Sequence, residues 1–66
     1  MDFIKCASYQ YPHEEIVINP KAIAVMEPLG ANGTEIYLMC KGKKCVEVAH
    51  SINDIVTMID EIEEGK

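Results

Sequence analysis

The fold is decided by one stretch from Thr34 to Ile59, which reads TEIYLMCKGKKCVEVAHSINDIVTMI. Its first part holds two runs rich in β-branched and aromatic residues on either side of Gly42-Lys43, which is typical of a β-hairpin. At Ser51 the period of the apolar residues changes from strand-like to helix-like. The stretch therefore predicts two antiparallel strands followed by a helix.

The helix is predicted over about residues 51–64. Ser51 and Asp54 resemble a capping box, with Asp in the place of the usual Glu or Gln. The apolar residues that follow are spaced as on a single helical face: Ile52, Ile55, Val56, Ile59 and Ile62. This face is expected to pack on the sheet.

Upstream of this stretch, short β-rich runs alternate with turn signals. Strands are expected over Asp2–Ser8, Glu15–Asn19 and Ala22–Pro28, with a type I turn at Asn19-Pro20-Lys21-Ala22 and a hairpin turn at Asn32-Gly33. We therefore expect one domain over residues 1–66, of class α+β. It would be a small antiparallel β-meander of four to five strands, with one C-terminal α-helix packed on one face.

Two-residue turns at Asn32-Gly33 and Gly42-Lys43 would also set the strand register. Val25 would then lie beside Cys40 and Cys40 beside Cys45, while Leu38 would lie between Glu27 and Glu47. The helix would leave one sheet face uncovered, with these residues as the expected partner or oligomer interface: Val25, Glu27, Leu29, Ile36, Leu38 and Glu47. A homodimer or higher oligomer would cover this mixed face, since soluble monomers avoid large apolar patches. Alternatively, the first strand and the loop 9–15 fold over it.

Charge indicates the kind of partner. Eleven acids against six Lys and Arg give a formal net charge of −5, which argues against nucleic acid as a partner, because its affinity depends on neutralising phosphates. An acidic surface at Asp60, Glu61, Glu63 and Glu64 is either a solvated tail or a docking site for a basic protein. No apolar run approaches the roughly 20 residues of a membrane span, and Met1-Asp2-Phe3-Ile4-Lys5 does not resemble a signal peptide. A cytoplasmic protein is expected.

The residues that could perform chemistry have simpler explanations. Zinc at Cys40 and Cys45 would need a second pair of ligands, a cross-strand disulfide is disfavoured in a reducing compartment, and a hairpin turn accounts for the spacing alone. Glu27 and Glu47, about 9–10 Å apart across two strand spacings, could form a carboxylate pair but have no evident cleft. His13 and His50 are expected at the surface or beside the helix cap. We expect no catalytic residue, metal or other cofactor.

From Glu15 onward the chain resembles the FlbD-like family of small flagellar and swarming-motility proteins. The segments "EIVINPKAIAVMEP" and "TEIYLMCKGKKCVEVAHSINDIVTMI" are similar to that family's "VNxxxIxxI", "TxIxLxxGxxxxVxES" and "xxEVxxxI" segments. The resemblance covers roughly the last 50 residues and rests on strand and helix patterning with a few turn residues. It implies a non-enzymatic accessory protein and no catalytic residue.

These observations predict a small, non-enzymatic protein-binding accessory module of the motility or phage host-modulating type. It would act through its acidic surface or its uncovered sheet face. The alternative is an oligomeric protein that sequesters a small molecule or nucleotide in a pocket between subunits.

Overall fold

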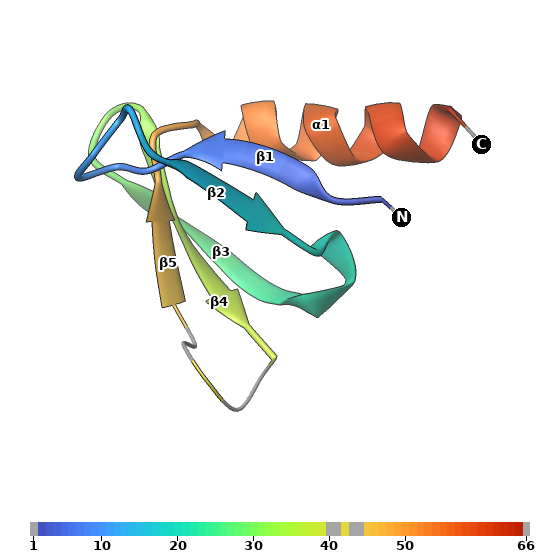
Figure 1. Ribbon diagram of the computed structural model, residues 1–66, viewed down its shortest axis with the longest axis horizontal. Helices are drawn as coiled ribbons and strands as arrows, with labels where there is room; N and C mark the ends of the chain where they lie inside the picture. The colour runs from blue at the N-terminus through green and yellow to red at the C-terminus, as the bar shows by residue number, and fades with distance from the viewer. Residues whose placement is uncertain (1, 40–41, 43–44, 66) are drawn as a thin grey trace.

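The computed structural model of the protein describes residues 2–39, 42 and 45–65. Figure 1 shows the helix along the top, with the strands below it. The elements are β1 (Ile4–Ala7), β2 (Glu15–Ile18), the 3-10 helix η1 (Pro20–Ala22), β3 (Ile23–Leu29), β4 (Gly33–Leu38), β5 (Cys45–Val48) and α1 (Ile52–Glu64). The expected α+β class, with antiparallel strands and one C-terminal helix, is confirmed.

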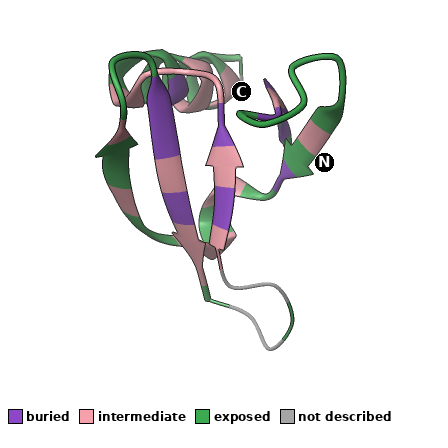
Figure 2. Ribbon diagram, turned by 90° about the vertical axis from the view of Figure 1, so that its left-hand side faces the viewer, coloured by how far each residue is buried: buried purple, intermediate pink, exposed green. Residues whose placement is uncertain are grey.

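The strands form two antiparallel sheets, β1-β2 and β3-β4-β5. An isolated bridge between Ser8 and Val48 joins them, supported by hydrogen bonds from the Tyr9 N–H to the Glu47 carbonyl (3.1 Å) and from the Ala49 N–H to the Ala7 carbonyl (2.8 Å). Figure 2 shows the resulting curved arrangement, with β5 beside β4 and the β1-β2 hairpin at one side. The three C-terminal strands make the expected meander, and β1-β2 is a separate hairpin bonded to its edge.

The core lies on the concave side of this arrangement. Side chains alternate between the two faces of a strand, and Thr34, Ile36, Val46 and Val48 of β4 and β5 are buried on the core side. The buried apolar residues are Ile4, Cys6, Ile18, Ile36, Val46, Val48 and Ile55. Because β1 and β2 contribute to this same cluster, the first strand does not cover the opposite sheet face as one alternative expected.

The helix begins where the sequence predicts. The Ser51 hydroxyl accepts a hydrogen bond from the Asp54 N–H at 3.2 Å, which is the expected N-cap interaction. Ile55 is fully buried, and Ile59 and Ile62 pack against the core. Val56 was expected on the same face but is 42% exposed, because it lies at the margin of the apolar stripe and Met58 packs inward.

The expected turn after β2 is also present. Asn19 accepts a hydrogen bond at its carbonyl from the Ala22 N–H (2.9 Å), and its side chain accepts one from the Lys21 N–H (3.0 Å). Pro20 starts η1, where its missing N–H is not needed. This turn reverses the chain from β2 to β3.

The predicted register of the β3-β4 hairpin is wrong. Val25 pairs with Tyr37 and Glu27 with Glu35, so β4 is displaced by three residues from the expected pairing. The chain turns at residues 30–32 instead of at Asn32-Gly33, with Gly30 in the left-handed region (φ +63°) that favours glycine. An odd displacement moves every β4 side chain to the other face.

The β4-β5 hairpin is displaced by the same amount. Tyr37, not Cys40, lies opposite Cys45, and Glu35, not Leu38, lies opposite Glu47. Cys40 and part of the expected Gly42-Lys43 turn lie outside the described residues. The two displacements cancel between β3 and β5, so Glu27 and Glu47 still share a row although the residue between them has changed.

Candidate functional site

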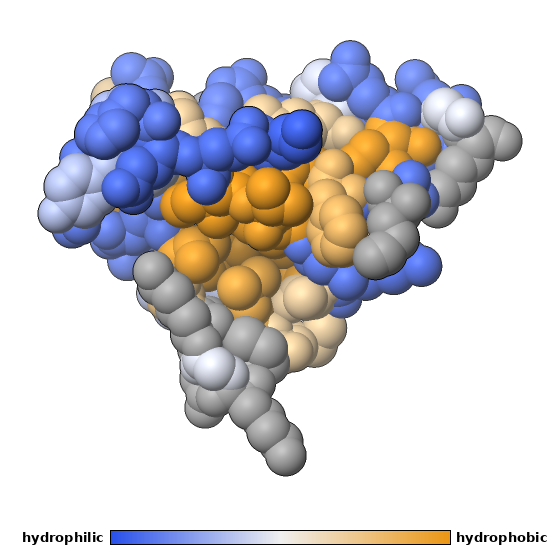
Figure 3. Space-filling model, viewed as in Figure 1, coloured by the Kyte–Doolittle hydropathy of each residue, from blue (hydrophilic) through white to orange (hydrophobic). Residues whose placement is uncertain are grey.

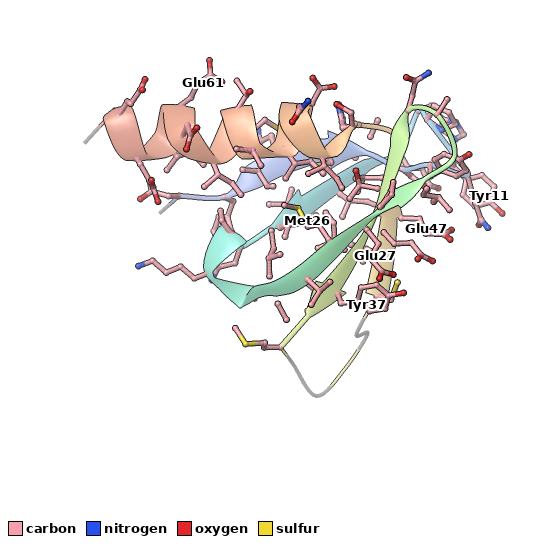
Figure 4. The ribbon with its side chains drawn as sticks, turned by 180° about the vertical axis from the view of Figure 1, so that it is seen from behind. Tyr11, Met26, Glu27, Tyr37, Glu47 and Glu61 are labelled. Atoms are coloured by element: carbon pink, nitrogen blue, oxygen red, sulfur yellow. The ribbon has the colours of Figure 1, made fainter. Side chains whose placement is uncertain are left out.

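The candidate site is the face of the β3-β4-β5 sheet that points away from the core. We call it the outer sheet face and define it by Val25, Glu27, Leu29, Glu35, Tyr37, Cys45 and Glu47. Figure 4 shows Glu27, Glu47 and Tyr37 together on this side, while Met26 points toward the helix. Neither α1 nor the strands β1 and β2 cover it, since these elements pack on the core side.

Four of the six residues expected at an interface lie on this face, and two do not. Val25, Glu27, Leu29 and Glu47 are here. Ile36 is fully buried and Leu38 packs against the core, because the register displacement turns both inward. Sequence reasoning missed Glu35 and Tyr37, which occupy the positions expected for Leu38 and Cys40. Gly30, another turn-forming residue, was the signal that could have shown the earlier turn.

Three glutamates form one row across the outer sheet face. Glu27 pairs with Glu35, and Glu35 pairs with Glu47, so neighbouring Cα atoms in the row are about 5 Å apart. Like charges directly opposite each other on adjacent strands destabilise a sheet by a few tenths of a kcal/mol to about 1 kcal/mol per pair. No salt bridge joins these carboxylates to Lys5 or Lys21, the two lysines in the described part of the chain. Within the described residues, the row therefore concentrates three carboxylates on the outer sheet face.

Tyr37 reports the electrostatic effect of this row. Its hydroxyl donates a hydrogen bond to Oε1 of Glu35 at 3.1 Å. That hydrogen bond, together with the negative charge of Glu35 and Glu27, raises the pKa of the Tyr37 phenol. Tyr37 thus remains a neutral donor beside the carboxylates, and its ring adds apolar surface next to the charged row.

Tyr9 borders the row on its other side. Its backbone continues the sheet beyond β5 through the hydrogen bond to the Glu47 carbonyl, and its ring lies over Gly33 and Gly30. A Cβ at Gly33 would be 2.5 Å from Cε1 of Tyr9, so any larger residue at this position would displace the ring or the backbone beside it. The loop 9–15 therefore reaches the outer sheet face at this one end, and the glutamates lie between two tyrosines.

The second predicted acidic surface, at the helix end, is arranged differently. Asp60, Glu61, Glu63 and Glu64 are all exposed, but at about 100° per residue they point in different directions around the helix. Glu61 borders a surface groove shared with Lys5, and Glu63 borders one shared with Lys21. Each of these two grooves therefore has both an acidic and a basic residue at its border, whereas no described lysine pairs with the glutamate row.

Three hollows in the described surface lie near the chain start. One of them, of about 400 Å³, runs between the start of β1 and α1, and is lined by Phe3, Ile4, Lys5, Met58, Glu61 and Ile62. None of the three hollows reaches the outer sheet face.

His50 and Cys6, which belong to residue types that often take part in catalysis or metal binding, have structural roles here. Nε2 of His50 accepts a hydrogen bond from the Ala7 N–H (3.0 Å), and its carbonyl accepts one from the Thr34 hydroxyl (2.7 Å), so His50 ties β1 and β4 to the start of the helix. Burial raises the pKa of the Cys6 thiol, which disfavours the reactive thiolate. No cluster of three or more His, Cys, Asp or Glu within the described ranges could hold a metal ion.

In comparisons with known proteins, no family model, curated protein or solved structure matches the chain. The resemblance to the FlbD-like family therefore stays a prediction from the sequence. No helix in the described residues is long and apolar enough to cross a membrane.

Proposed function

We propose that this chain is a small, non-enzymatic accessory protein that binds a basic protein surface on its outer sheet face. The observation that supports this most directly is the uncovered row of Glu27, Glu35 and Glu47. A lysine or arginine placed over the row would replace carboxylate repulsion with charge-assisted hydrogen bonds. A motility-accessory or phage host-modulating role, as implied by the sequence, fits a protein of this kind.

The surroundings of the row favour a protein over a simple counterion. Tyr9 is 41% exposed and Val25 is 50% exposed, and Tyr37 and Leu29 are partly exposed on the same face. Tyrosine is enriched at protein interfaces, where its ring buries area and its hydroxyl keeps a polar contact. A binding partner with alternating basic and apolar side chains would match both parts of this surface.

Electrostatics would govern the rate and selectivity of this binding. Complementary charge speeds encounter and excludes acidic partners, and the net charge of −5 adds a long-range contribution. Because the glutamates are exposed or only partly buried, salt should weaken the complex, with a Debye length of about 8 Å at physiological ionic strength.

A titration followed by NMR tests the proposal. The probe is a synthetic decapeptide of alternating arginine and leucine, added to isotopically labelled protein, with an alternating glutamate and leucine peptide as its control. We expect saturable shifts at the amides of Glu27, Glu35, Tyr37 and Glu47 with the basic probe only. Shifts confined to the helix end, or equal shifts with both probes, would contradict binding at the outer sheet face.

A matched pair of variants separates the two acidic surfaces. Glu35→Gln removes the central charge of the row and keeps an acceptor for Tyr37, and it should weaken probe binding about fivefold. Glu61→Gln removes one equal charge from the helix and should leave the affinity nearly unchanged. Equal weakening by both variants would mean that only net charge matters.

The alternative, a small-molecule or nucleotide store between subunits, has weaker support in the geometry. The hollow of about 400 Å³ is bordered by both Lys5 and Glu61, so it does not present the cluster of donors that a phosphate group would require. A metabolite that co-purifies in stoichiometric amount, detected by mass spectrometry after denaturation, would favour this alternative over protein binding.

A further inference from the structure

Strand β2 has an open edge. It pairs with β1 on one side only, and no other strand in the described part of the chain pairs with its second side. The Ser8 N–H donates a hydrogen bond to the Glu14 carbonyl (3.0 Å), so these two residues form a hydrogen-bonded pair at the end of the β1-β2 ladder. Hydrogen-bonded and non-hydrogen-bonded pairs alternate along an antiparallel ladder. By that alternation the backbone groups of Ile16 and Ile18 point toward β1, and those of Glu15 and Val17 point to the open edge.

The two terminal strands of the curved arrangement differ in how they are protected. The β3 edge holds Pro28, which has no N–H, and a register irregularity between Ile23 and Val25. Both features are devices by which proteins prevent a sheet edge from pairing with another chain. β2 has neither, and Val17 on it is 53% exposed. The β2 edge is therefore open to pairing along its whole length in the described structure.

Apolar surface lies around this same strand. Figure 3 shows orange surface gathered in the middle of the view, where Figure 1 places β2. Ile16 is only partly buried although it packs against the core. Additional cover over β2 would complete the burial of side chains that the hairpin leaves at the margin of the core.

We propose that a second copy of this chain pairs with β2, so that two molecules form a two-fold dimer with a continuous β1-β2-β2-β1 sheet. The sequence of β2 is self-complementary for this arrangement. With Val17 on the two-fold axis, Val17 faces Val17, Ile16 faces Ile18, and Glu15 faces Asn19 of the second copy. The outward-pointing N–H and C=O groups of the two Val17 residues then bond to each other, as in a hydrogen-bonded antiparallel pair.

Charge favours the same orientation. Glu15 stands at the start of β2, and Lys21 follows shortly after its end. Antiparallel pairing brings the acidic start of each strand near the basic end of the other, on both sides of the two-fold axis. A parallel pairing would place Glu15 beside Glu15, which like-charge repulsion disfavours.

This dimer is independent of the proposed partner-binding face. Its contact surface is β2, whereas the glutamate row lies on β3, β4 and β5. It also differs from the interface expected from sequence, because Ile36 and Leu38 point into the core and cannot form it. Dimerisation and binding of the basic probe can therefore fail or succeed separately.

Sedimentation equilibrium of three proteins tests the proposal. The wild type should approach twice the 7.4 kDa chain mass at concentrations up to about 500 µM, which would populate a dimer with a micromolar Kd. Val17→Lys places a charge on the β2 edge and should give the monomer mass. Val25→Lys is the matched control, since Val25 is similarly exposed (50%) but lies on the outer sheet face, and it should remain dimeric. A wild-type monomer throughout, or a dimer that survives Val17→Lys, would overturn the proposal.

Cross-linking gives a second readout if Val17→Lys fails to fold. Hydrogen-bonded antiparallel pairs have Cα atoms about 5.5 Å apart, within the range of a disulfide. In a background with Cys40→Ser and Cys45→Ser, Val17→Cys should form a disulfide-linked dimer under mild oxidation, and Val25→Cys should not. Absence of the cross-link at position 17, or equal cross-linking at both positions, would contradict pairing at β2.

Discussion

The ring of Tyr9 lies against the backbone of Gly33, at a distance that leaves no room for a side chain. A Cβ at Gly33 would be 2.5 Å from Cε1 of Tyr9 and 2.6 Å from the Leu29 carbonyl oxygen. Gly33 is therefore a buried strand residue covered by an aromatic ring, and the turn is made by the residues before it. This single contact couples the loop after β1 to the register of β3 and β4.

Gly33→Ala should consequently destabilise the protein. Either the Tyr9 ring must move or the β3-β4 turn must distort, at a cost of about 2 kcal/mol for an overpacked site. For a domain of this size that cost lowers the melting temperature by roughly 10 °C. Gly42→Ala is the control, because nothing lies within 4 Å of a Cβ at Gly42, and its melting curve should match the wild type. Equal melting curves for both variants would show that Tyr9 does not pack as described.

His50→Leu should destabilise the contact between β1 and the start of the helix. It removes the acceptor of the Ala7 N–H and leaves that group partly buried without a partner, which costs about 1–3 kcal/mol. His50→Gln can present its amide oxygen near the position of Nε2 and should recover much of the loss. Chemical denaturation of the three proteins measures this, and a His50→Gln variant no more stable than His50→Leu would exclude the hydrogen bond as the cause.

Leu38→Glu and Val25→Glu test the register directly. In the register expected from sequence both residues share one face, but in the structure Leu38 packs against the core and Val25 is half exposed on the outer sheet face. Leu38→Glu should cost about 2–3 kcal/mol, because it places a carboxylate against apolar residues, and Val25→Glu should cost less than about 1 kcal/mol. Similar losses from the two substitutions, measured by urea unfolding, would support the sequence-based register instead.

Tyr37 should titrate at higher pH in the folded protein than in the unfolded chain. The hydrogen bond to Glu35 and the nearby carboxylates disfavour the phenolate, so the pKa of Tyr37 is raised above its ordinary value near 10.0. The unfolded state then releases the proton first as pH rises. This stabilising contribution is complete below about pH 10 and is lost as pH rises through the folded pKa.

Two variants test whether Tyr37 is responsible for this pH dependence and whether Glu35 raises its pKa. In Glu35→Gln, the titration midpoint of the Tyr37 phenol, followed by NMR of its ring carbons, should fall toward the ordinary pKa of tyrosine. The reason is that this change removes the nearest charge. Tyr37→Phe should show a smaller loss of stability between pH 9 and 11 than the wild type. A midpoint that does not move in Glu35→Gln would mean that the charge of Glu35 is not the source of the raised pKa.

Local interactions alone determined several features of this protein. The Ser51 cap, the isoleucine stripe of the helix and the Asn19-Pro20 turn depend on neighbouring residues, and the structure has each of them. The alternation of branched residues also placed strands at nearly their observed positions. Such features are readable from sequence because the partners of each group lie within four residues along the chain.

Only the tertiary structure decided the register and therefore the candidate site. Asn32-Gly33 is a strong local turn signal, but in the structure Gly33 is a strand residue beneath the ring of Tyr9, more than twenty residues away, and the turn begins at Gly30. The resulting three-residue displacement buries Ile36 and Leu38 and brings Glu35 between Glu27 and Glu47. A strand has a side-chain period of two, so this odd displacement decides which face of the sheet each residue of β4 occupies.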